Sequence, residues 1–495
     1  MTGADWGAAA PALCLLGAAL LAVGVDLFLP RTRSWGLTEW IAYGGIVGAM
    51  GAAWGLGGGV AFDGALTVDA LSRFVATAVL VATMLAGIVS ADSLGPRRVL
   101  LPEYYALLLS SAAGMVLLVM SHDLITMFLS VEILSLALYV LCGITRTDPR
   151  SNESAMKYFV LGSFASGFLL YGMALIYGAT GTVFLEGMAA KLGTATSATA
   201  LAGVGLLVAG FAFKVGAAPF HMWVPDVYEG APTPVTAFMS VAVKAAGFGA
   251  LVRILLGGLP AQAEEWGPLV GALAALTMIV GNLGALTQTS VKRMLAYSSV
   301  AHTGYALIGL AAAGALAGRG APEGPAAALF YVGVYTVMTL GAFLFLMFAG
   351  RPATPASPGR DAETYDDLNG LARRRPWAAA FMTILMVSLA GVPPTAGFFG
   401  KFTLFKSAVD ADCAGLAVLG VIMSVVSAAY YLRVVVAMYM KDAPHETEEE
   451  AAAEPKPDPS AGLAVGVSAF LTLAFGLAPG WILETARAAA NFLLR

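Results

Sequence analysis

The chain has 495 residues, of which 59% are hydrophobic and only 12% are charged, and its formal net charge at pH 7 is −4. Soluble domains carry about 25% charged residues, so this composition excludes a soluble enzyme and predicts a protein that crosses a membrane many times. The three cysteines lie far apart and form no CxxC pair, which argues against an iron–sulfur cluster and a disulfide framework. Because the sequence also has neither a GxGxxG turn nor a phosphate-binding loop, any redox cofactor is expected on other chains.

We predict an all-α polytopic membrane protein with about fourteen transmembrane helices, because each crossing needs about 20 predominantly apolar residues. In chain order, the predicted spans are residues 8–29, 38–58, 68–91, 103–120, 123–144, 154–180, 198–222, 233–257, 265–287, 294–316, 327–349, 377–409, 413–440 and 461–483.

These spans divide the chain into consecutive parts. Residues 1–100 are an N-terminal three-helix segment, residues 101–260 and 261–440 are two five-helix repeats, and residues 461–495 hold the C-terminal helix. Residues 441–460 are acidic and contain proline, which is typical of a flexible linker. Because five is an odd number of crossings, helices 9–13 are expected to be inverted in the membrane relative to helices 4–8.

The basic residues of the predicted loops predict the orientation. Most of these lysines and arginines fall in loops after odd-numbered helices. By the positive-inside rule these loops are cytoplasmic, and the N- and C-termini are expected on the periplasmic side. The acidic loop 441–460 then also lies on the cytoplasmic side.

Two predicted helices are interrupted by proline. The seventh contains Pro219 after Lys214, and the twelfth contains Pro393 and Pro394 before Lys401. Proline removes a backbone donor and kinks or breaks a helix. Broken helices in corresponding places of two halves are typical of a transport site, so Lys214 and Lys401 are expected to be counterparts.

Four ionisable residues lie in or next to segments that otherwise match lipid-buried helices: Glu132, Lys214, Lys244 and Lys401. A charge near the bilayer centre costs about 3 kcal/mol on insertion scales, so such residues indicate function. Burial disfavours the charged form of lysine and glutamate, whereas a Glu–Lys pair favours it. A Glu132–Lys214 pair that forms and breaks would therefore take up and release a proton, and the four residues together predict a proton path.

His302 lies in the predicted tenth helix, and histidine is the side chain that changes charge near neutral pH. It is expected to bridge Lys244 and Lys401, with help from nearby serine and tyrosine hydroxyls. Lys292, just before this helix, is a weaker relay candidate because it also satisfies the positive-inside pattern.

Each of these residues also has a structural interpretation. Alternatively, the side chains of Glu132, Lys214 and Lys244 only form ion pairs or polar contacts that hold helices together. Lys401 is alternatively a lysine whose side chain extends to the membrane surface. His302 is alternatively a histidine that bonds a backbone carbonyl within the bundle.

Several blocks of the sequence resemble one family. They read MFLSVEILSLALYVLCG, FKVGAAPFHMWVPDVYEGAPTPVTAFMSVAVKAAGFGALVR, SVKRMLAYSSVAHTGYALIGL and LAGVPPTAGFFGKFTLFKSAV. These blocks resemble the subunit N family of bacterial NADH:quinone oxidoreductase, respiratory complex I. The resemblance covers nearly the whole chain, and DVYEGAPTPVTAF favours this family over its sister subunits.

The resemblance implies a proton-translocating subunit with broken helices seven and twelve. It implies Glu132 and Lys214 as the interacting pair, Lys244 as the central lysine and Lys401 as the terminal one, with His302 and Lys292 at positions of the family pattern. It also implies a bacterial inner-membrane location, with sister subunit M and the small subunit K as flanking neighbours. FMN, iron–sulfur clusters and quinone are expected on partner subunits, with no cofactor on this chain and no nucleic-acid partner.

Two other functions stay open from the sequence. The chain is alternatively a subunit of a multisubunit cation/proton antiporter or of a membrane-bound hydrogenase, since these share most of the buried lysines. A third interpretation is a membrane scaffold whose buried charges only hold helices together.

Overall fold

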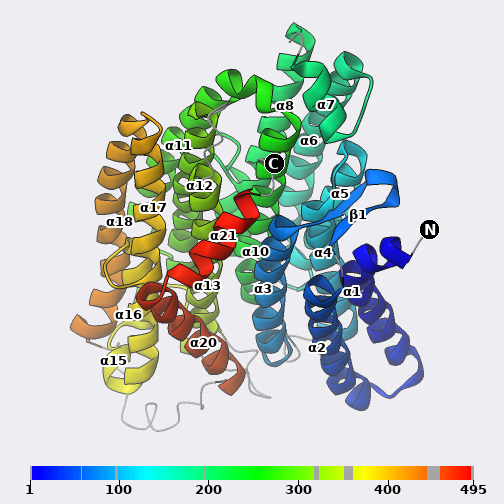
Figure 1. Cartoon of the computed structure of the whole chain (residues 1–495). Helices are drawn as coiled ribbons and strands as arrows, with labels where there is room; N and C mark the ends of the chain where they lie inside the picture. The colour runs from blue at the N-terminus through cyan, green and yellow to red at the C-terminus, as the bar shows by residue number, and fades with distance from the viewer. Residues whose placement is uncertain are drawn as a thin grey trace.

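The structure, a computed structural model, describes residues 3–56, 58–94, 99–193, 197–316, 323–350, 360–442 and 458–491. Figure 1 shows long helices that lie side by side, with the N-terminal helices at one edge of the bundle and helices from residues 376–440 at the opposite edge. The predicted all-helical membrane fold is confirmed. Most of the predicted linker, residues 443–457, lies outside the described residues.

The N-terminal part holds three long helices and a small hairpin. Its elements are α1 (Gly3–Phe28), α2 (Arg31–Gly55), β1 (Gly59–Ala61), the 3₁₀ turn η1 (Phe62–Gly64), β2 (Leu66–Val68) and α3 (Ala70–Leu94). The two strands pair antiparallel, with Gly59 opposite Val68. The hairpin was not predicted, because strands of three residues are too short to show a period of two.

The middle of the chain contains the first broken helix. Its elements are α4 (Leu101–Met120), α5 (Leu124–Cys142), α6 (Pro149–Thr180), α7 (Leu185–Leu192), α8 (Ala198–Val215), α9 (Trp223–Gly230), α10 (Thr233–Val252), the π-helical turn η2 (Arg253–Gly258) and the 3₁₀ turn η3 (Pro260–Gln262). The short helices α7 and α9 were not predicted as separate elements, since each is only 8 residues long.

The last part contains the second broken helix. Its elements are α11 (Ala263–Leu286), α12 (Val291–Ala315), α13 (Glu323–Ala349), α14 (Tyr365–Leu368), α15 (Leu371–Arg374), α16 (Pro376–Ala390), α17 (Ala396–Asp410), α18 (Ala414–Met440), α20 (Pro459–Leu477) and α21 (Gly480–Asn491). The predicted span 461–483 ends early, because the chain turns after α20 and α21 packs against α13 and α3.

Within the described residues, 11 helices are long and apolar enough to cross a membrane. The other predicted spans correspond to α2, α12 and the α16–α17 pair. Helix α12 is less apolar because it carries charged, histidine and hydroxyl side chains that face other helices rather than lipid. Every residue of α10 is buried, and α10, α12 and α13 pack against one another at the centre of the bundle.

The two breaks have the same local form. Gly216 caps the end of α8 and Gly391 caps the end of α16, both in the left-handed region with φ of 74° and 89°. A cis X–Pro bond ends three residues after each glycine, at Pro219 and at Pro394. This likeness supports the prediction of two related halves.

Candidate functional site

The first two predicted site residues lie on neighbouring helices. Lys214 is in the last turn of α8 and only 4% exposed, and its ammonium donates to the Ser135 hydroxyl of α5 at 2.7 Å. Glu132, one turn before Ser135, is half-buried and accepts from the Ser166 hydroxyl of α6 at 2.5 Å. No ion pair of the described residues joins Glu132 to Lys214, although the two charges lie close enough to interact. Serine hydroxyls therefore occupy the positions where a direct pair was expected.

A threonine connects the end of α8 with the next lysine. The Thr303 hydroxyl of α12 donates to the Val215 carbonyl at 2.7 Å and lies 3.2 Å from the Ser299 carbonyl. The Lys244 ammonium, 3% exposed in α10, donates to that same Ser299 carbonyl and to the Ser299 hydroxyl. The two lysines are thus linked through one turn of α12.

Tyrosine side chains surround His302. Its Nδ1 lies 2.6 Å from the Tyr331 hydroxyl and its Nε2 lies 2.9 Å from the Tyr431 hydroxyl, which also bonds the Ser298 hydroxyl. The Tyr335 ring lies 5.3 Å from the His302 ring, and its hydroxyl donates to Ser299 at 2.8 Å. His302 therefore bonds two phenols rather than a backbone carbonyl.

Lys401, the last of the predicted lysines, lies in α17 just after the second break. Its ammonium donates to the carbonyls of Leu389 and Ala390 at 2.9 and 3.0 Å and to the Ser424 hydroxyl at 2.8 Å. The side chain is buried, so it does not extend to the membrane surface. Its Nζ lies 4.8 Å from the centre of the Tyr305 ring, which also neighbours His302.

The two lysines of the breaks are not at equivalent positions. Lys214 comes two residues before Gly216, whereas Lys401 comes after Gly391 in the chain. The residue two before Gly391 is Leu389, whose carbonyl Lys401 contacts. Lys401 thus reaches back to the position that corresponds to Lys214.

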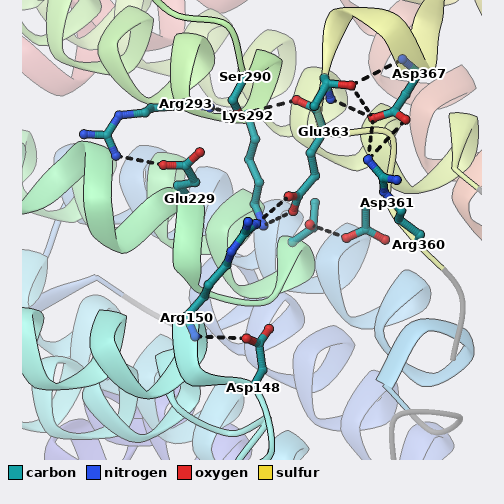
Figure 2. Close-up of polar contacts among 12 residues, drawn as sticks. Asp148, Arg150, Glu229, Ser290, Lys292, Arg293, Arg360, Asp361, Glu363 and Asp367 are labelled. Atoms are coloured by element: carbon teal, nitrogen blue, oxygen red, sulfur yellow. Dashed lines mark hydrogen bonds and ion pairs between the residues drawn. The ribbon is translucent and has the colours of Figure 1, made fainter.

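Lys292 lies apart from these residues, at the start of α12. Figure 2 shows its side chain extending toward Glu363, and the two form an ion pair at 3.0 Å. Its ammonium also donates to the Ala231 carbonyl at 3.0 Å, and the side chain is 3% exposed. We refer to this end of the bundle as the Lys292 end, and to the opposite end, where Arg253 lies, as the Arg253 end.

Sequence reasoning missed the groups that hold the predicted residues. These are Ser135, Ser166, Thr303, Tyr331, Tyr335, Ser424 and Tyr431. A hydroxyl inside an otherwise apolar helix is the only signal that could have marked them. Within the described residues, no group of three or more His, Cys, Asp and Glu side chains is arranged to hold a metal ion.

An apolar helical bundle with two helices broken beside buried lysines defines a membrane transport protein. Residues 121–427 match the family described as "NADH:quinone oxidoreductase/Mrp antiporter, TM". This match covers more than half of the chain, which therefore belongs to that family.

Comparison with individual proteins shows which members of the family this chain is similar to. NADH-quinone oxidoreductase subunit N of Trichlorobacter lovleyi is 44% identical over 486 residues, which are 97% of this chain and 96% of that protein. A chain of respiratory complex I from Thermus thermophilus with bound aureothin superposes with a TM-score of 0.78 at 33% identity, covering 96% of this chain and 98% of that one. A chain of the Mrp complex from Dietzia sp. gives a TM-score of 0.82 at 22% identity over 100% and 98% of the two chains, which shows a shared fold alone.

Proposed function

We propose that this chain is a proton-translocating membrane subunit of an NADH:quinone oxidoreductase. The observation that carries the proposal is that Lys214, Lys244 and Lys401 are buried and that none of them takes part in an ion pair of the described residues. A buried ammonium without a counter-charge is costly, so its neutral form is readily reached. Lysines in this state take up and release protons readily, because no ion pair holds them in the charged form.

The contacts suggest the order of transfer. Glu132 and Lys214 lie at one end of the series, Lys244 follows through Thr303 and Ser299, and His302 lies between Lys244 and Lys401. Serine and tyrosine hydroxyls both donate and accept hydrogen bonds, so they can bond a neighbouring lysine or histidine in its neutral and in its protonated form. Each proton moved against the membrane potential requires about 2.3 kcal/mol per 100 mV, which redox chemistry on other subunits would supply.

The similarity to subunit N also supports a proposal for the membrane location, orientation and partners of the chain. We infer a bacterial inner membrane, with the Lys292 end in the cytoplasm, because the loops at this end carry most of the basic residues. Both termini then lie on the periplasmic side. Other complex I membrane subunits are the partners, with M and K as the flanking neighbours, and FMN, iron–sulfur clusters and quinone lie on partner subunits.

A cation/proton antiporter subunit is the second candidate, because the description of the matching family also includes the Mrp antiporter. The full-length identity of 44% to a subunit N protein favours the oxidoreductase, since the antiporter chain shares only 22%.

The test is NADH-driven proton pumping in inverted membrane vesicles that carry Lys244→Met, with the amount of assembled complex measured alongside. We expect pumping per assembled complex to fall at least about tenfold, because a single proton-transfer group contributes about a hundredfold or more. Lys441→Met, at an exposed position, is the matched control. Normal pumping by Lys244→Met would contradict the proton path and favour a scaffold. If NADH oxidation in the host does not depend on this chain, the antiporter function is favoured.

A further inference from the structure

The segment 360–368, which we name the strap, is fixed at the Lys292 end of the bundle. The Val291 amide donates to the Glu363 carbonyl at 2.7 Å, and the Ala362 amide donates to the Leu346 carbonyl at 2.8 Å. Thr364 and Asp367 form a capping box that starts α14. Because its backbone is bonded on both sides, the strap holds its side chains in set positions.

Side chains of the strap join three helix starts. Glu363 accepts from Lys292 of α12 at 3.0 Å, and Arg150 of α6 lies 3.7 Å from its second oxygen. Asp361 accepts from the Thr233 hydroxyl of α10 at 2.5 Å. Figure 2 shows Lys292 and Arg150 converging on Glu363 from different helices. Glu363 is therefore the carboxylate at which the starts of α12 and α6 meet.

Glu363 and Lys292 differ in their access to water. The Glu363 side chain is 26% exposed, whereas the Lys292 side chain is 3% exposed. Of the two groups, the Glu363 carboxylate is therefore the one that water reaches more readily. A partly hydrated carboxylate beside a buried amine is suited to collect a proton from water and pass it inward.

Polar groups line the interval between Lys292 and Lys244. The Ala231 carbonyl accepts from Lys292 at 3.0 Å and from the Thr236 hydroxyl at 3.4 Å. The Thr236 hydroxyl also donates to the Tyr228 carbonyl at 2.9 Å, and the Tyr228 side chain lies against Ser299. Ser299 in turn accepts from Lys244 at 2.6 Å. On α12 itself, Lys292 and Ser299 are seven residues apart and so share one helix face.

From this arrangement we propose that Glu363 is the proton-collecting residue of this subunit and that the Glu363–Lys292 pair is its uptake gate. This inference rests on the proposed function. After Lys292 has passed its proton inward, a solvent proton binds the Glu363 carboxylate and moves to the Lys292 amine, which restores the ion pair. Lys292 then gives up one proton toward Lys244 after Lys244 has released its own, so each cycle takes in one proton and passes on one.

The experiment compares Glu363→Gln with Glu229→Gln in inverted vesicles, where the cytoplasmic face meets the medium. Glu229 is the matched control, because its carboxylate is similarly exposed but pairs with Arg293 rather than Lys292. We expect Glu363→Gln to lower pumping per assembled complex at least about tenfold at an external pH of about 8, since the collecting group is lost. The loss should be smaller at an external pH of about 6, where protons are more abundant. Glu363→Asp should keep most of the activity, and Glu229→Gln should match wild type.

Among the described residues, Glu363 forms ion pairs with Lys292 and Arg150, and both remain in the glutamate variants. Equal pumping by Glu363→Gln and Glu229→Gln at both pH values would overturn the gate. If Glu363→Gln does not assemble, the exchange Lys292→Glu with Glu363→Lys replaces it, because the ion pair is kept. Wild-type pumping by the exchanged protein would then overturn the gate, and low pumping would support it. Loss of pumping in Lys244→Met with normal pumping in Glu363→Gln contradicts the gate alone, whereas normal pumping in Lys244→Met contradicts the proposed function.

Discussion

Gly391 lies directly against the side chain of Lys401. A Cβ atom at Gly391 would lie 2.9 Å from Lys401 Cδ and 3.4 Å from its Nζ, and the backbone φ there is 89°. Only glycine adopts this φ without strain, and only glycine leaves room for the lysine. The break between α16 and α17 and the position of the terminal lysine are therefore set by the same residue.

Gly391→Ala should displace the Lys401 ammonium from the carbonyls of Leu389 and Ala390. The left-handed backbone adds about 1–2 kcal/mol of strain for a residue with a Cβ. We expect proton pumping to fall several-fold while the complex still assembles, measured in inverted vesicles with assembly checked on native gels. Gly415→Ala is the control, since nothing lies within 4 Å of a Cβ there. Equal pumping by the two variants would show that Lys401 does not depend on Gly391.

Tyr431→Phe should slow proton transfer through His302. The change removes the hydroxyl that bonds His302 Nε2 and Ser298 and keeps the ring. A buried polar group left without its partner costs about 1–3 kcal/mol, so His302 should change its position or its proton occupancy. Pumping should fall several-fold. The neighbouring Tyr430→Phe, which removes a bond to Asn282 and none to His302, should affect pumping much less. Similar rates for both variants would argue against a role for the Tyr431 hydroxyl.

Arg253→Met should destabilise the Arg253 end of the bundle. The Arg253–Asp69 ion pair is fully buried at 2.8 Å, and Arg253 also donates to the Val119 carbonyl. Removing one partner of a buried pair costs about 3–5 kcal/mol, because the other charge stays uncompensated. We expect a lower thermal midpoint and less assembled complex.

The double variant Arg253→Met with Asp69→Asn tests whether the uncompensated Asp69 charge causes the loss of stability. It should recover part of the lost stability, since no uncompensated charge remains. Arg373→Met is the surface control, because its ion pair with Asp442 is exposed and such pairs contribute at most about 1 kcal/mol. A double variant that is no more stable than Arg253→Met would contradict the explanation.

His122 lies in the turn between α4 and α5. We expect its protonation to lower the stability of the folded chain in mild acid. Burial, followed by the nearby Arg253 charge, lowers the pKa of His122 below its ordinary value of 6.5, although Glu186 opposes this. At higher pH His122 is neutral in both the folded and the unfolded state. As the pH falls below 6.5, the unfolded state binds a proton that the folded state does not, so stability decreases. Thermal unfolding of wild type and His122→Gln from about pH 7.5 to 5.5 checks this, and the variant should lose less. If the thermal midpoints of wild type and His122→Gln fall equally with pH, His122 is not the cause of the acid sensitivity.

The helices, the breaks and the buried ionisable residues were predictable from the sequence. Lys244 lies in a segment that is otherwise apolar, and Pro219 and Pro394 interrupt apolar runs, so each gives a local signal. The contacts around them were not predictable. Glu363 lies 71 residues from Lys292 in the chain, and Tyr431 lies 129 from His302, so no local pattern relates these pairs. The short elements β1, α7 and α9 were missed because 3 or 8 residues are too few to show a periodic pattern.

The aromatic rings beside the buried ammonium groups have a practical consequence. Lys244 Nζ lies 5.4 Å from the Tyr335 ring centre and Lys401 Nζ lies 4.8 Å from that of Tyr305, both within reach of a cation–π interaction. The electric field of an ammonium changes the ultraviolet absorption of a phenol this close, whereas a neutral amine has a weaker effect. The chain thus carries its own optical reporters of lysine charge. Difference spectra of Tyr335→Phe and Tyr305→Phe would assign each signal, and time-resolved spectra would then show the order in which Lys244 and Lys401 lose their protons.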